Sequence, residues 1–434
     1  MAASASASTT GGTTAPVITA GRAATVTVFG IIASMMAAFD SISRNLAMPF
    51  VIKEFHLSVA TVSDLVALGF AVTFLSSQII GPLMDRIGRK RAFLIALFAA
   101  GVTSGVTAFV TNAWEFGIVA ALSGTCLVAA APVAVMVAEE SPRKARSILM
   151  ALVQGSFSGG SLVLGVVGSA ILPGGHWRML FLIGFCPLLL LVLSQIFLRE
   201  PPRSAEALRV KRARDAEAGN LTFAVDVERA RRSEWRQLFE PGVRRQTIVL
   251  CVGGFFINFS PIFVLGLSAT YFSLYDHIGI GAISLALSLE GVGAIIGAVV
   301  LGVLGSWFRT RDLVIASAFT GGIVLVLFGI HAGTSQIMLL MGLYGFLGQG
   351  LIGIWGRYIA ESYPTRMRGT ASGFVMGFYF LSSVPAPVLF GALVGGGHFV
   401  LTAVLAGVVV VIGGIVLLLG KAHPVGAELE DLAV

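Results

Sequence analysis

The sequence alternates between long apolar segments and short polar ones along most of its length. A segment of about 20 apolar residues is long enough to cross a membrane, and it crosses as a helix because backbone groups in lipid must hydrogen-bond internally. A soluble core does not require such uninterrupted runs. The pattern predicts an all-α membrane protein with twelve transmembrane helices, over residues 25–50, 61–83, 92–112, 115–138, 147–171, 179–198, 246–273, 279–306, 312–331, 336–360, 370–394 and 399–420.

The basic residues between these segments favour one side of the membrane. Alternate loops carry Arg86, Arg89 and Lys90, then a dense basic run from Arg199 to Arg245, whereas the opposite loops contain little besides Lys53 and Arg178. Lys and Arg accumulate in cytoplasmic loops. We therefore expect a protein of the bacterial inner membrane with both termini and the long central loop in the cytoplasm.

An internal repeat divides the chain into two halves. Glu139, Pro142 and Arg146 recur 222 positions later as Glu361, Pro364 and Arg368. The loop that begins at Gly81 has a less well preserved counterpart beginning at Gly302, at nearly the same offset. The expected organisation is a cytoplasmic tail (1–23), a six-helix half (24–199), a polar linker (200–243), a second six-helix half (244–420) and a short tail (421–434).

The composition narrows the classes of function. Hydrophobic residues make up 56% of the 434 residues and charged ones 12%, and the net charge is +7. The positive charge lies in short loops without interleaved aromatic residues, so topology explains it better than nucleic-acid binding. The cysteines show no metal spacing, and HExxH and GxSxG patterns are absent from the sequence. We therefore expect neither an enzyme nor a cofactor, and the lipid bilayer as the main partner of a monomer.

The loop Gly81-Pro-Leu-Met-Asp85-Arg86-Ile-Gly88-Arg89-Lys90 resembles the signature between helices 2 and 3 of the major facilitator superfamily. The resemblance extends from helix 1 to helix 12. It implies a transporter that works by alternating access, with this loop as a conformational latch. The expected latch set comprises Gly81, Asp85, Arg86, Gly88, Arg89, Glu139, Arg146, Arg357, Glu361 and Arg368.

Three further segments are similar to the aromatic acid and organic acid proton symporters of that superfamily. They begin at Trp177 before helix 6, at Leu238 before helix 7 and at Glu361 after helix 10, while the segment from Arg199 to Arg203 also resembles sugar porters. Two positions depart from the organic acid pattern. Ala37 stands where the first of two aspartates in helix 1 is expected, and Ala120 stands where many proton-coupled members have an arginine in helix 4.

Few ionisable residues lie within the predicted spans, and such residues mark functional sites in membrane proteins. Asp40 and Arg44 are four positions apart on helix 1 and face the same side, so they can pair. Glu290 has no basic residue within two helical turns, and a low-dielectric setting favours the protonated form of an isolated carboxylate. We expect Asp40 and Glu290 to couple protons, although a purely structural pair and an untitrated Glu290 remain open alternatives.

Polar and aromatic residues on the helices that line the family's cavity complete the candidate site. The expected substrate-binding residues are Arg44, Asn45, Gln154, Asn258, Tyr344, Gln349, Trp355 and Tyr379. The leading hypothesis is uptake of a small organic acid anion, aromatic acids included, driven by the proton gradient. Proton-driven efflux of drugs or metabolites and sugar or polyol symport are the alternatives.

Overall fold

The structure is a computed structural model that describes residues 20–123, 130–141, 146–200, 238–330, 333–363 and 368–422. These residues form helices and their connections, and eleven of the helical segments are long and apolar enough to cross a membrane. The predicted span 115–138 corresponds to two helices, α4 and α5, with residues 124–129 between them outside the described part. The all-α membrane fold is confirmed.

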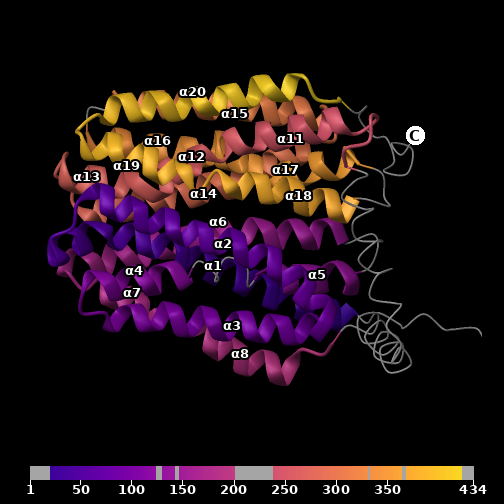
Figure 1. Cartoon of the computed structure of the whole chain (residues 1–434), viewed down its shortest axis with the longest axis horizontal. Coiled ribbons are helices and arrows are strands. Elements are labelled where there is room, and N and C mark those ends of the chain that lie inside the picture. Colours follow the sequence, from indigo (N-terminus) through magenta and orange to yellow (C-terminus); the bar gives the residue numbers. More distant parts are fainter. Residues whose placement is uncertain are drawn as a thin grey trace, which may run out of the picture.

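The N-terminal half contains the helices drawn from indigo to magenta in Figure 1. They are α1 (Ala20–Phe55), α2 (Val59–Ile87), α3 (Arg89–Val106), the 3-10 turn η1 (Thr107–Phe109), α4 (Ala113–Leu122), α5 (Ala130–Glu140), α6 (Arg146–Ile171), the 3-10 turn η3 (Leu172–Gly174), α7 (Arg178–Ile183) and α8 (Cys186–Phe197).

The C-terminal half lies beside the first, and it is drawn from rose to yellow in Figure 1. Its elements are α11 (Arg244–Ile257), α12 (Phe259–Pro261), the π-helix η4 (Ile262–Leu267), α13 (Ser268–Leu274), α14 (Ile280–Leu304), α15 (Thr310–Phe328), α16 (Thr334–Leu347), the 3-10 turn η5 (Gln349–Leu351), α17 (Ile352–Glu361), α18 (Arg368–Leu381), α19 (Pro385–Gly395) and α20 (Phe399–Leu418).

The repeat predicted from the sequence also appears in the backbone. His56 directly follows α1, the first span of the N-terminal half, and His277 lies 221 positions later, three residues after α13 ends the first span of the C-terminal half. Both have left-handed backbone conformations, with φ of 53° and 54°, and they are the two non-glycine residues with positive φ in the described part of the chain. Histidine is among the residues that tolerate this region when it closes a helix.

The helix ends that include Ala20, Glu140, Glu361 and Leu418 gather at one end of the bundle, which we call the terminal end (Figure 1). The opposite end, with His56 and His277, is the distal end. The halves meet through α6 against α14, α2 against α19, and α1 against η4 and α13. Because α13 and α19 form the distal portions of their spans, two of these contacts lie toward the distal end.

Close helix approach explains part of the contact between the halves. A Cβ atom on Gly291 of α14 would lie 2.7 Å from the carbonyl oxygen of Ser158 on α6. The Ser288 hydroxyl donates to the carbonyl of Leu162, also on α6, at 3.3 Å. Small residues allow membrane helices to approach in this way.

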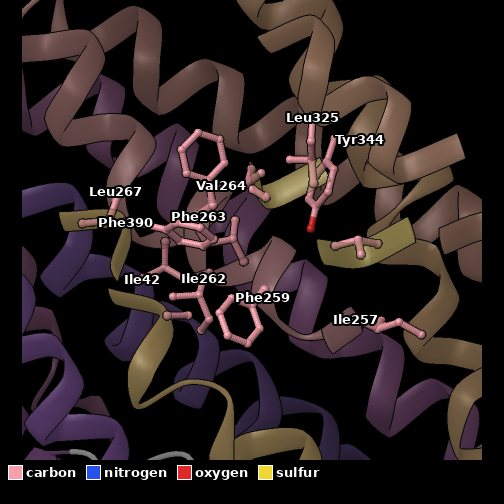
Figure 2. Close-up of a cluster of buried hydrophobic side chains, with 14 of the residues drawn as sticks. Ile42, Ile257, Phe259, Ile262, Phe263, Val264, Leu267, Leu325, Tyr344 and Phe390 are labelled. Carbon is pink, nitrogen blue, oxygen red and sulfur yellow. The ribbon is translucent and has the colours of Figure 1, made fainter. Parts of the chain in front are cut away.

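The apolar core extends across the junction of the halves. Figure 2 shows Ile42 of α1 close to Ile262 and Phe263, which belong to the C-terminal half. Phe263 also packs edge-to-face against Phe390 of α19, with ring centroids 5.6 Å apart. Side chains from α1, η4 and α19 thus close the distal region between the halves.

Candidate substrate and coupling site

The ion pair expected in helix 1 forms and is buried. The Arg44 guanidinium donates to Asp40 Oδ2 at 2.9 Å, and the two residues are 9% and 4% exposed. The same nitrogen, Arg44 Nη1, also donates to the hydroxyl of Ser123 after α4. The second carboxylate oxygen, Asp40 Oδ1, is buried without a hydrogen-bond partner in the described residues. Arg44 Nη1 is therefore hydrogen-bonded both to a charged carboxylate and to a neutral hydroxyl.

Arg44 also lines a small cavity of about 30 Å³ between α1, α2 and α4. Ser41 and Asn45 contribute from α1, the α2 wall is mainly apolar, and Ala120 contributes from α4. The Asn45 side chain makes no hydrogen bond among the described residues, and its Nδ2 lies about 4.0 Å from where a Cβ on Gly266 would stand. Asn45 thus lies where the cavity approaches the π-helix of the other half, and π-helical turns frequently occur at functional sites.

Ala120 stands where an arginine is expected in helix 4 of many proton-coupled members. In the structure, Ala120 and Arg44 border the same cavity. Ser123, which Arg44 contacts, is three residues after Ala120. The guanidinium therefore reaches the region of helix 4 from helix 1. A sequence comparison confined to helix 4 misses this arrangement, because only the fold brings the two helices together.

Glu290 lies inside the C-terminal half, away from any counter-charge shown in the described residues. It is 1% exposed, and its Oε2 atom has no hydrogen-bond partner there. Gly345 of α16 packs directly against the Glu290 backbone. The neighbouring Tyr344 is within electrostatic range of Glu290, and its hydroxyl, visible in Figure 2, donates to Ser260 Oγ at 3.0 Å. An ionised carboxylate costs several kcal/mol in such a setting unless it is paired.

Asn258 occupies the break between α11 and α12, four residues before the π-helix of the seventh span begins. Its amide donates to the Tyr379 carbonyl at 2.9 Å, to Ser382 Oγ at 3.0 Å and to Ser383 Oγ at 2.9 Å. The acceptors lie where the eleventh span is interrupted before Pro385. Asn258 therefore joins two interrupted helices, and its donors are already used for that purpose.

Three other predicted residues lie in the C-terminal half. Trp355 and Tyr379 are in contact, with ring centroids 6.1 Å apart, and Trp355 Nε1 is buried without a partner in the described residues. Gln349 is 6% exposed and begins the 3-10 turn that interrupts the tenth span. By contrast, Gln154 on α6 is exposed and belongs to the lining of neither cavity described for the N-terminal half.

A polar network at the terminal end holds the N-terminal half together. Arg22 donates to both oxygens of Glu140, at 2.7 and 3.0 Å, and to the carbonyl of Glu200 at 3.0 Å. The Glu200 carboxylate accepts the backbone N–H groups of Arg89 and Lys90 at 2.7 and 2.9 Å, so it caps the start of α3. Arg22, Glu140 and Glu200 are not among the site residues predicted from the sequence.

The corresponding network of the C-terminal half is largely neutral. Gln246 donates to Ser362 Oγ at 2.9 Å and accepts from the Lys421 N–H at 2.7 Å. Ser362 stands 222 positions after Glu140, which is the offset of the repeat. The Arg311 guanidinium donates to the carbonyl of Gly420 at 3.0 Å. At the position that corresponds to Glu140, the C-terminal half therefore has a hydroxyl in place of the acid.

Four of the predicted latch residues have contacts that the structure describes: Gly88, Arg89, Arg357 and Glu361. Gly88 has φ of 100°, and a Cβ there would lie 2.9 Å from the Glu200 carboxylate, so the turn favours glycine. Arg357 and Glu361 form the expected pair at 2.6 Å, within one half. The remaining latch predictions fall on side chains outside the described residues: Gly81, Asp85, Arg86, Glu139, Arg146 and Arg368.

Two packed helical halves, a buried ion pair beside a cavity and interrupted helices at membrane depth define a polytopic membrane transporter. The profile of the Major Facilitator Superfamily matches residues 30–277 and 264–431. The chain belongs to that superfamily. This membership confirms the family resemblance and identifies the protein as a transporter and not an enzyme.

Several characterised relatives carry names of organic acid transporters. The chain is 26% identical to the gallate transporter of Pseudomonas putida, over 82% of this chain and 81% of the relative. It is 26% identical to the gentisate transporter of Corynebacterium glutamicum, over 86% and 82%. It is 23% identical to the cis,cis-muconate transport protein of Acinetobacter baylyi, over 90% and 92%.

Solved structures confirm the fold. A D-xylose-proton symporter superposes with a TM-score of 0.75 at 18% identity, covering 93% of this chain and 98% of that one. The inward-open xylose transporter XylE from E. coli superposes with a TM-score of 0.71 at 18% identity, covering 94% and 99%. At these identities the likeness concerns the fold alone.

Proposed function

We propose that this transporter takes up a small organic acid anion, with aromatic acids as the main class, together with protons. The observation that best supports this proposal is the position of Arg44, a cation in the wall of a largely apolar cavity. The cavity holds only about 30 Å³ in this structure, so the halves must open around Arg44 to admit an aromatic anion. The apolar α2 wall suits a ring, and the guanidinium suits a carboxylate. The names of the gallate and gentisate transporters support this class.

The ion pair provides a simple way to couple the anion to a proton. Arg44 is bound by Asp40 in the structure, so an incoming carboxylate must compete with Asp40 for the guanidinium. Protonation of Asp40 removes that competition and leaves Arg44 available to the substrate. The buried charge then stays balanced, because one carboxylate replaces another. Proton and anion therefore favour each other's binding.

Glu290 serves as the second proton site in this proposal. Its burial without a partner and its position beside Tyr344 and Ser260 support the role, because a change of charge there must rearrange nearby polar groups. Rocking of the halves around the cavity alternates its access between the two sides. We further propose that the terminal end faces the cytoplasm of a bacterial inner membrane.

Uptake by the purified full chain in proteoliposomes tests the assignment. Labelled 4-hydroxybenzoate, gallate and gentisate are offered with an inwardly directed proton gradient. Wild-type protein should accumulate at least one of them, and Arg44→Gln should abolish uptake while the protein remains folded by thermal unfolding. Arg178→Gln is the matched control, because Arg178 pairs with Glu54 in an exposed position at the distal end. Equal uptake by both variants would refute the role of Arg44.

A further inference from the structure

A second cavity opens on the outer side of the N-terminal half, between α1, α6 and the junction of α7 with α8. We call it the lateral groove, and it has a volume of about 290 Å³. Its lining is almost entirely apolar and comprises Ile32, Met35, Met36, Phe39, Asp40, Gly160, Val163, Val167, Ile183, Gly184, Cys186 and Pro187. The single charged residue in the lining is Asp40.

The surroundings of the groove place it on the lipid side of the bundle. Val163 in its wall is 41% exposed, and the adjacent apolar residues Val166 on α6 and Leu189 on α8 are 54% and 67% exposed. Exposed aliphatic side chains on helices of this length face the acyl chains of the bilayer. Molecules dissolved in the membrane can therefore reach the groove without entering the cavity beside Arg44.

Asp40 gives the groove a hydrogen-bond acceptor that needs a donor. The residue is 4% exposed, and Arg44 binds only its Oδ2 atom. The Oδ1 atom is buried and accepts no hydrogen bond from the described residues. A buried carboxylate oxygen without a donor is an unsatisfied group, and such groups in native structures commonly mark a missing partner. The other side chains that line the groove are aliphatic, aromatic or thioether groups apart from the Cys186 thiol, and a thiol is only a weak donor.

We propose that the lateral groove binds a lipid-soluble molecule in which one O–H group is attached to an apolar ring, as in a phenol or an undissociated aromatic acid. Because Asp40 Oδ1 has almost no accessible surface, the groove must widen beside it when the molecule binds. The O–H then donates to Asp40 Oδ1, and the ring lies among Met35, Phe39 and Val163. A cation is not required, because Arg44 already balances the Asp40 charge. An acyl chain alone leaves the carboxylate oxygen without a donor. The inference does not depend on which substrate crosses the membrane.

Two probes that differ by one methyl group test the hydrogen bond. A photoreactive alkylphenol is cross-linked to the full chain in nanodiscs, and the labelled residues are mapped by mass spectrometry. The competitors are 4-butylphenol and its methyl ether, which cannot donate. We expect labelling of groove residues such as Val163 and Ile183, and roughly ten- to a hundred-fold stronger competition by the phenol than by the ether. Competition by undissociated benzoic acid, offered at low pH, shows whether the groove prefers the O–H of an acid or the O–H of a phenol.

Variants of exposed groove residues provide the matched control. Val163→Trp fills the groove and should abolish the labelling, whereas Val166→Trp lies one helical turn along α6, outside the lining, and should retain it. In Asp40→Asn the advantage of the phenol over the ether should fall several-fold, because the acceptor is no longer charged. If this variant does not fold, the comparison of the phenol with its methyl ether on the wild-type protein still tests the hydrogen bond. Equal competition by phenol and ether, or labelling that survives Val163→Trp, would overturn the proposal.

Discussion

Removing one partner of the buried pair of Asp40 and Arg44 should cost far more stability than removing one partner of an exposed pair with the same spacing. Arg357 and Glu361 also stand four residues apart on one helix, with nitrogen and oxygen 2.6 Å apart compared with 2.9 Å for the buried pair. The side chains of Arg357 and Glu361 are 45% and 13% exposed, and those of Arg44 and Asp40 are 11% and 5% exposed. Burial is therefore the main variable that separates the two pairs.

The proposed change is Arg44→Met, which keeps the length of the side chain and removes its charge. It leaves the Asp40 carboxylate buried without a partner, and breaking a buried pair in this way costs about 3–5 kcal/mol. Ser123 stays satisfied, because its hydroxyl also donates to the Ala120 carbonyl at 2.9 Å. Arg357→Met should cost only about 0.3–0.5 kcal/mol, as for other exposed pairs of this spacing.

Unfolding in mixed micelles by sodium dodecyl sulfate, followed by tryptophan fluorescence, measures both losses. A double variant completes the test, because Asp40→Asn combined with Arg44→Met removes both charges together. Replacing a whole buried pair is close to neutral, so the double variant should recover most of the stability that Arg44→Met loses. The reasoning fails if Arg44→Met and Arg357→Met lose equal stability, or if the double variant is less stable than Arg44→Met alone.

Three more outcomes follow from other contacts. Glu200→Gln should weaken the cap of α3 by about 0.5–1 kcal/mol and speed hydrogen exchange at the Arg89 amide; unchanged exchange would contradict the cap. Gly291→Leu, whose Cβ would stand 2.7 Å from the Ser158 carbonyl, should separate the halves and abolish uptake without loss of expression, and normal uptake would argue against the close approach. Asn258→Ala should lower the free energy of unfolding by about 1–3 kcal/mol, and a thermal midpoint equal to wild type would exclude its bridging role.

Hydropathy predicted the spans well because the bilayer imposes a length on each of them. The predicted segment 399–420 became α20, and 61–83 became the central part of α2. The interruptions were harder to foresee. The sequence around Asn258 has the composition of an ordinary apolar helix, and the π-helix there accompanies hydrogen bonds to residues more than 120 positions away. Long-range contacts of this kind leave no local signal.

The candidate site likewise has contacts that the sequence predicted and contacts that only the fold reveals. The Asp40 and Arg44 pair was predictable, because both residues lie on one helix at i and i+4. The contact of Arg44 with Ser123 joins two spans and required the fold. At the terminal end, Glu139 and Glu140 are adjacent in the sequence, and a helix turns by about 100° between neighbours. The sequence alone does not tell which of two adjacent acids faces Arg22, and the structure assigns that contact to Glu140.

The central claim is that proton and carboxylate are coupled through competition for Arg44. The most direct measurement compares two modes of transport by Asp40→Asn in proteoliposomes, using a hydroxybenzoate that the wild type transports. Exchange between labelled and unlabelled substrate needs no net proton movement, so the account predicts that the variant retains exchange and loses accumulation driven by the proton gradient. Gradient-driven accumulation at the wild-type level in this variant would contradict the account.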